Sequence, residues 1–71
     1  MALYEVGIYN KYVRAKIRNM EEPPAGLEAS WEDTNLFEIE APNAKAAEES
    51  ILLKYPARQG FVIDGVFKLN R

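Results

Sequence analysis

The 71-residue chain is 48% hydrophobic and 28% charged, with a net charge of −2 at pH 7, and this composition suits one small globular domain. A core of this size is expected to supply no more than about 3 to 5 kcal/mol of net stability. The chain has no cysteine and no histidine, which excludes disulfides, the usual zinc sites and catalysis by either residue. Self-association is therefore the favoured source of extra stability, and we expect a homo-oligomer, most simply a homodimer.

The charges are distributed unevenly along the chain. Residues 1–20 carry +3, residues 21–50 carry −8 and residues 51–71 carry +3. Such a molecule suits head-to-tail pairing with itself or a charged partner. Glu38 and Glu40 would share one strand face, where a solvated acidic surface is favoured over an active site, and no calcium-loop spacing is present.

We therefore expect no enzymatic activity, no metal and no cofactor. The chain has no charged-then-apolar leader and no apolar run near 18 residues. These absences favour a cytoplasmic protein with no membrane association.

Residues 3–18 predict a β-hairpin whose two loop residues are Asn10 and Lys11. With this turn, Ile8 lies opposite Val13 among apolar pairs on one face, and Glu5 lies opposite Lys16 on the other face. One hairpin face would be dry and the other wet. The alternative is that residues 3–18 form one long bulged strand, which would give a sheet of three strands rather than four.

Residues 19–34 predict a long acidic loop, because Pro23, Pro24 and Gly26 prevent regular strand pairing. Leu27 and Trp31 are four residues apart, so one helical turn would bring them together. This turn either closes one end of the core or forms a recognition loop in which Trp31 is the anchor.

Residues 35–41 alternate and predict a half-buried strand with Phe37, Ile39 and Ala41 inward. Pro42 ends this strand. Asn43 is a suitable N-cap for a helix over residues 43–55, which Pro56 terminates. The predicted inward stripe of the helix consists of Ala44, Ala47, Ile51 and Tyr55, with Leu52 at its edge. Leu53 falls on the opposite side, either as a tolerated exposed leucine or as part of a second packing surface.

Residues 60–69 predict a last strand with Phe61, Ile63, Phe67 and Leu69 on one face. Asp64-Gly65 is also a strong hairpin dipeptide, but a turn there leaves arms of only about three residues. We prefer a single strand in which Gly65 is a bulge or a site of close approach.

In chain order these elements give a β-β-β-α-β arrangement. The predicted fold is a single small α+β domain over residues 1–71, with a small antiparallel or mixed sheet of three or four strands and one helix packed on one face. The order of the strands, and therefore the open edge of the sheet, is not determined by the pattern.

Two functional hypotheses concern the surface. The first is a non-enzymatic protein-binding module, adaptor-like or inhibitor-like, that self-associates through a sheet edge or the uncovered sheet face. Aromatic and apolar residues outside the inferred core would make the contact; they are Trp31, Leu27, Tyr9, Tyr12 and Leu53.

The second hypothesis is nucleic-acid binding through the outer face of the hairpin. Aromatic and basic side chains alternating on a strand can stack nucleobases and hold phosphates. The residues concerned are Tyr9, Lys11, Tyr12, Arg14, Lys16 and Arg18. The net charge of −2 opposes this hypothesis, and no RNP-type aromatic motif supports it.

Overall fold

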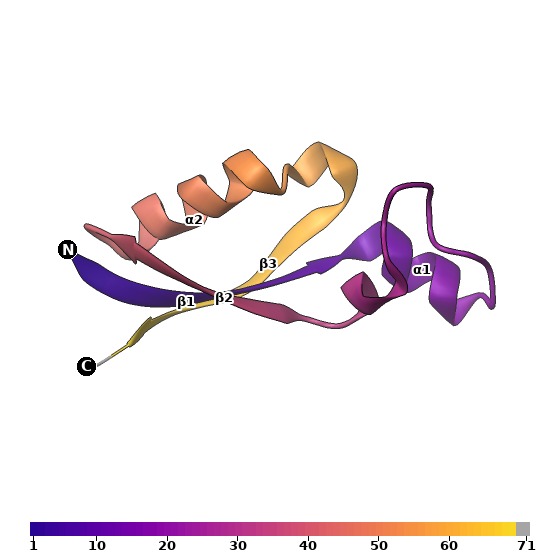
Figure 1. Ribbon diagram of the computed structural model, residues 1–71, viewed down its shortest axis with the longest axis horizontal. Coiled ribbons are helices and arrows are strands. Elements are labelled where there is room, and N and C mark those ends of the chain that lie inside the picture. Colours follow the sequence, from indigo (N-terminus) through magenta and orange to yellow (C-terminus); the bar gives the residue numbers. More distant parts are fainter. Residues whose placement is uncertain (70–71) are drawn as a thin grey trace.

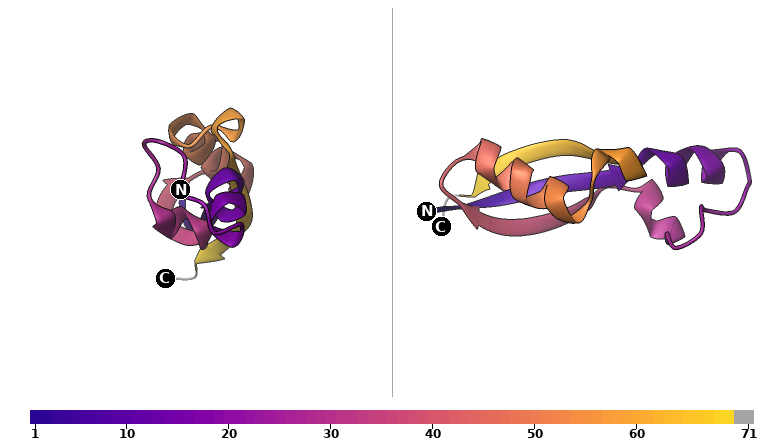
Figure 2. Two further views of the ribbon diagram at one scale, coloured as in Figure 1. Left: turned by 90° about the vertical axis from the view of Figure 1, so that its right-hand side faces the viewer. Right: turned by 90° about the horizontal axis from the view of Figure 1, so that it is seen from above.

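The computed structural model describes residues 1–69 and has an α+β fold, as the sequence predicts. Its elements are β1 (Ala2–Asn10), α1 (Lys11–Arg18), the 3-10 turn η1 (Ala29–Glu32), β2 (Asn35–Ala41), α2 (Ala44–Lys54), the 3-10 turn η2 (Ala57–Gln59) and β3 (Phe61–Leu69). The three strands form one antiparallel sheet in the order β2-β1-β3. α2 lies over one face of this sheet, and α1 extends beyond one end of the sheet (Figures 1 and 2).

The predicted hairpin over residues 3–18 is wrong, because its second arm is the helix α1. The two-residue period of a strand fits Val13, Ala15 and Ile17. However, Val13 and Ile17 are also four residues apart, as on one face of a helix. The side-chain oxygen of Asn10 accepts hydrogen bonds from the amides of Tyr12 and Val13 and so starts a helix where a turn was expected. The single bulged strand is wrong for the same reason, and the second helix departs from the one-helix prediction.

β1 therefore finds its antiparallel partners far along the chain. Val6 lies between Phe37 of β2 and Val66 of β3, and Ile8 lies between Asn35 and Ile63. Both hydrogen-bonding edges of β1 are thus occupied, which leaves no place for a hairpin arm. The sheet has three strands, the lower of the two predicted numbers.

The core lies between the sheet and α2. Alternate residues of β1 point toward α2, and Val6 and Ile8 are fully buried. The fully or nearly fully buried core residues are Tyr4, Val6, Ile8, Ala41, Ala47, Ile51 and Phe61.

β2 and α2 agree closely with the predicted strand and helix. Phe37 and Ile39 pack against the core as expected, and Asn43 accepts a hydrogen bond from the amide of Ala46 at 2.8 Å, which confirms the predicted N-cap. Ala44 was expected to face inward but is exposed, and Ala46 packs against the core instead.

β3 is continuous through Gly65, which confirms the single-strand interpretation. Its register against β1 shifts between Gly7 and Ile8, so that Asp64 is an extra residue in the ladder. This bulge reverses the alternation. Phe61 and Ile63 face the core as predicted, but Phe67 is 59% exposed and lies with Leu69 on the other face, where the prediction was wrong.

A buried polar contact joins the start of α1 to the start of β3. Asn10 is 0% exposed, and its side-chain amide donates to the carbonyl of Gln59 at 3.0 Å. The amide of Lys11 donates to the carbonyl of Gly60 at 2.8 Å. Gly60 has φ +96°, and a Cβ at this position would collide with the rings of Tyr12 and with Asn10. Only glycine suits this junction.

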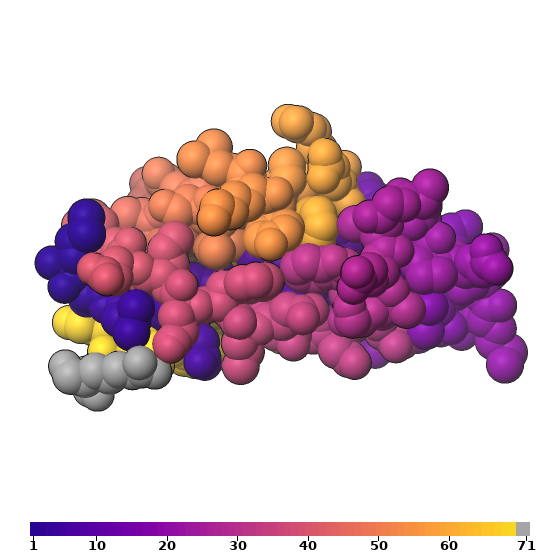
Figure 3. Space-filling model, in the orientation of Figure 1, coloured from indigo at the N-terminus to yellow at the C-terminus, as the bar shows by residue number. Residues whose placement is uncertain are grey.

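The loop over residues 19–34 packs at the α1 end of the molecule and contains η1. Figure 3 shows it as a compact mass continuous with β2. The Nε of Arg14 donates to the carbonyl of Glu32 at 3.0 Å and ties α1 to η1. This bond holds η1 beside α1.

Candidate interaction site

The sheet face opposite α2 carries apolar side chains and is not covered by any other element of residues 1–69 (Figure 1). We call it the outer face. The pairing of the strands places on it Leu3, Glu5, Gly7, Tyr9, Leu36, Glu38, Glu40, Val62, Gly65, Phe67 and Leu69. Leu36 is 61% exposed and Phe67 is 59% exposed. Two large apolar side chains so exposed on one sheet face make it a candidate interaction surface.

The middle of the outer face is shaped by two glycines. Gly7 and Gly65 lie opposite each other in the register. The hydroxyl of Thr34 donates to the carboxylate of Asp64 at 2.7 Å, and both side chains pass close to Gly7, where a Cβ would lie 2.9 Å from the methyl of Thr34. This contact links β3 to the residue just before β2, across Gly7 of β1.

The ring of Phe67 lies over Gly65. A Cβ added to Gly65 would come within 2.7 Å of this ring, so the glycine permits the ring to lie flat along its own strand. Covering a strand glycine with an aromatic ring stabilises the exposed backbone. The arrangement also presents the other side of the ring outward.

Charge differs between the two ends of the outer face. Glu5 lies opposite Glu38, and Glu40 lies opposite Leu3, all at the end away from α1. At the α1 end, the guanidinium of Arg14 lies 3.6 Å from the ring centroid of Tyr9. Glutamates thus gather at one end of the face, and Arg14 lies at the other.

Trp31 and Leu27, two of the predicted contact residues, lie against the core. The ring of Trp31 is 5.0 Å from that of Phe61 and 5.2 Å from that of Tyr55, measured between centroids. Both Trp31 and Leu27 are only partly buried. This placement supports the interpretation that the turn closes one end of the core, with most of the indole surface used inside the molecule.

The other predicted contact residues lie on separate surfaces. Leu53 is 85% exposed on α2, on the side of the molecule opposite the outer face. Tyr12 is 47% exposed on α1. Tyr9 belongs to the outer face, beneath Arg14. The five predicted residues thus do not form one patch.

The six residues of the nucleic-acid hypothesis are also separated, because the shared strand face is absent. Tyr9 is on β1 and the other five are on α1. The rings of Tyr9 and Tyr12 already have cations over them, Arg14 at 3.6 Å and Lys11 at 5.5 Å from the centroids. Lys16 forms an ion pair with Glu21 at 3.5 Å. Base stacking on these rings would require their present contacts to break.

Sequence reasoning missed Leu36 and Phe67 as surface residues. Phe67 was assigned to the core because an unbroken period of two connects it to Phe61. The Asp64-Gly65 dipeptide was the available signal, since a bulge there moves every later residue to the other face.

Across residues 1–69, no helix has the length and apolar character needed to cross a membrane. The same residues contain no cluster of three or more acidic side chains arranged to hold a metal ion. No family model, no curated protein and no solved structure matches this chain.

Proposed function

We propose that the protein is a small non-enzymatic protein-binding module that associates with a second copy of itself through the outer face. The observation that carries this proposal is the pair of exposed apolar side chains, Leu36 and Phe67, on a sheet face without a covering layer. A domain with a small core and no disulfide gains stability by covering such a face.

The size of the outer face implies a weak dimer. Three strands about 4.8 Å apart, paired over about seven residues of about 3.3 Å each, give a footprint on the order of 300 Å². The largest apolar patch on a monomer is often about 300 to 600 Å². Two such footprints fall below the roughly 1,200 Å² of a standard stable interface, so the association is concentration-dependent.

The charges of the face support a copy turned end for end. α1 continues the long axis of the sheet (Figure 2), and Arg18 lies four residues from Arg14 on the same side of this helix. Turning a second copy about an axis across the strands brings its basic α1 over Glu5 and Glu40 of the first copy. The reverse contact forms at the same time, as two-fold symmetry requires.

Asp64 lies near the proposed two-fold axis and therefore faces Asp64 of the second copy. Packed sheets lie about 10 Å apart between their backbones, so the two carboxylates come closer than this and repel each other. The hydroxyl of Thr34 holds each carboxylate against its own sheet at 2.7 Å, and this one repulsive pair opposes acid-base contacts at both ends of the interface. The charge contribution should make the dimer stronger at low salt.

Sedimentation equilibrium of the purified chain over a range of concentrations tests the proposal. We expect a monomer-dimer equilibrium in the wild type. Phe67→Ser removes a ring from each protomer, and burying its exposed half contributes about 1 to 1.5 kcal/mol per ring, so dimerisation should weaken about 30- to 150-fold. Leu53→Ser is the matched control, because Leu53 is even more exposed but lies on α2.

A strictly monomeric wild type at millimolar concentration would refute self-association. Equal weakening by the two substitutions would refute the assignment to the outer face. Adding a mixed single-stranded oligonucleotide tests the other hypothesis, since a mass increase at 50 mM salt that disappears at 200 mM salt would support nucleic-acid binding. Circular dichroism of each variant checks that the monomer remains folded.

A further inference from the structure

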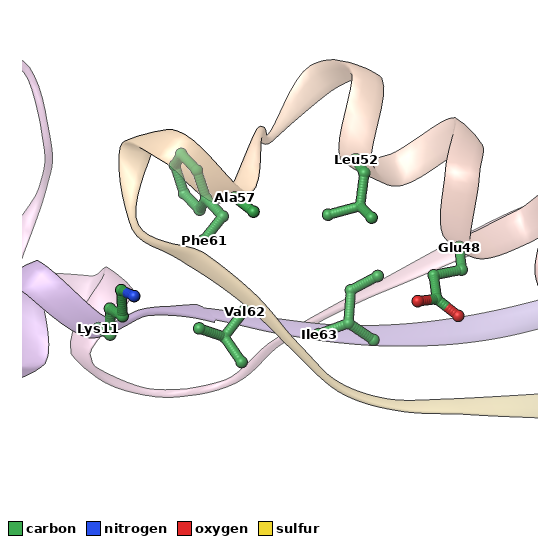
Figure 4. A pocket seen from close by; sticks show the side chains of 7 residues that line it. All are labelled: Lys11, Glu48, Leu52, Ala57, Phe61, Val62 and Ile63. Carbon is green, nitrogen blue, oxygen red and sulfur yellow. The ribbon is translucent and has the colours of Figure 1, made fainter.

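A second candidate surface is a cleft of about 330 Å³ between α2 and β3, on the side of the molecule away from β2. Leu52 of α2 and Phe61 and Ile63 of β3 form its apolar wall. Figure 4 shows Lys11 at one end of the cleft and Glu48 at the other, with the apolar side chains between them. The volume lies at the lower limit of typical ligand pockets, which suits one or two side chains.

Within residues 1–69, the two charged residues of the cleft have no ionic partner. The ion pair in this part of the chain joins Lys16 to Glu21, so neither Lys11 nor Glu48 is neutralised by a residue that the structure describes. The ammonium of Lys11 lies 5.5 Å from the ring centroid of Tyr12 and remains exposed. The cleft is therefore complementary to a ligand with an anion at one end and a cation at the other.

The backbone of β3 beside the cleft is available for pairing, because β3 is an edge strand. The Lys11 amide bonds the Gly60 carbonyl at the start of the β1–β3 ladder. Because hydrogen-bonded and non-hydrogen-bonded pairs alternate in antiparallel strands, Val62 directs its N–H and C=O toward β1. Phe61 and Ile63 then direct theirs away from β1, toward the cleft side. The bulge at Asp64 limits this free edge to the beginning of β3.

We propose that this cleft binds an extended peptide segment of another protein, which adds a fourth strand antiparallel to β3. Strand addition to an exposed sheet edge combines backbone hydrogen bonds with pockets for alternate side chains. Antiparallel pairing directs the peptide from the Glu48 end to the Lys11 end. The matching sequence has a basic residue, an apolar residue and an acidic residue at alternate positions, all on the side facing the cleft.

A fluorescein-labelled probe, acetyl-Thr-Lys-Thr-Leu-Thr-Asp-Thr-amide, tests this by fluorescence anisotropy on the full chain. The reversed probe exchanges the lysine and the aspartate. We expect the wild type to prefer the first probe by about five- to tenfold, as two exposed ion pairs allow. The double variant Lys11→Glu, Glu48→Lys should prefer the reversed probe. The control Glu49→Lys, Lys54→Glu makes the same charge changes elsewhere on α2 and should leave the wild-type preference intact.

Backbone methylation tests the strand pairing separately. The leucine N–H of the bound probe points to β3, so N-methylation there should weaken binding at least about tenfold. Methylation of the neighbouring threonine N–H, which points away, should have little effect. No probe binding at millimolar concentration, equal effects of the two methylations or an unchanged preference in the Lys11, Glu48 variant would overturn the proposal. Using the Phe67→Ser variant as a second background keeps these results independent of dimerisation.

Discussion

Replacing Asn10 with alanine should remove most of the stability of this domain. Asn10 is fully buried and makes three hydrogen bonds, accepting from the amides of Tyr12 and Val13 at 3.0 and 3.1 Å and donating to the carbonyl of Gln59 at 3.0 Å. Loss of a helix cap costs about 1 kcal/mol. Each buried polar group left without a partner costs about 1 to 3 kcal/mol more. The expected loss is about 2 to 4 kcal/mol, nearly the whole of the roughly 3 to 5 kcal/mol available.

Asn43→Ala is the matched control for this prediction. Asn43 caps α2 through one hydrogen bond to the amide of Ala46, but its side chain is exposed. Water can replace the lost partner, so the free energy of unfolding should fall by no more than about 1 kcal/mol. The comparison separates two costs to the free energy of unfolding. One is the loss of a capping hydrogen bond, and the other is leaving buried polar groups without a partner.

Urea denaturation followed by circular dichroism measures both effects at one protein concentration. With an m-value of about 1 kcal/mol/M for so small a domain, Asn10→Ala should lower the midpoint by about 2 to 4 M and Asn43→Ala by about 1 M or less. Asn10→Ser, which retains a capping oxygen but cannot reach Gln59, should fall between them. Equal shifts in the two alanine variants would refute the reasoning, because burial would then contribute nothing.

Two further predictions concern other parts of the molecule. Gly60→Ala should destabilise the domain by more than about 2 kcal/mol, because it combines backbone strain at φ +96° with collisions of the new Cβ. The control Gly26→Ala, at φ +84° with open space around it, should cost only about 1 kcal/mol. Similar decreases in melting temperature for the two variants would contradict this explanation. In the proposed dimer, Glu40→Lys and Arg18→Glu should each weaken self-association, whereas an equimolar mixture should form heterodimers in which both acid-base contacts are present. Sedimentation of the mixture at low salt checks this, and heterodimers no more stable than either homodimer would exclude the end-for-end arrangement.

The sequence predicted the second half of the fold better than the first, for a physical reason. Residues 35–41 fit the two-residue period of a strand, and residues 43–55 fit the 3.6-residue period of a helix. Asn43 marks the boundary between the two segments. Residues 11–18 fit both the strand period and the helix period. Whether they form a strand or a helix depends on whether Asn10 lies in a hairpin turn or caps a helix. Local pattern cannot decide this choice, because the decisive contacts of Asn10 and Lys11 are with Gln59 and Gly60, far along the chain.

The candidate sites show the same dependence on distant contacts. Tyr9 was correctly placed on an outward-facing strand surface, but the position of Phe67 follows from one extra residue in the ladder. Trp31 was expected either to close the core or to anchor a partner, and its contacts with Tyr55 and Phe61 support the first interpretation. The cleft could not be predicted at all, since it needs the relative placement of α2, β3 and Lys11.

The strand order β2-β1-β3 places the first strand of the chain in the middle of the sheet. During synthesis β1 is made before both of its partner strands, and β3 follows only after α2. Until residues 61–69 leave the ribosome, one side of a strand that contains Val6 and Ile8 stays open to other nascent chains. The folding yield of this domain in cells should therefore depend on how well β1 is protected during that interval.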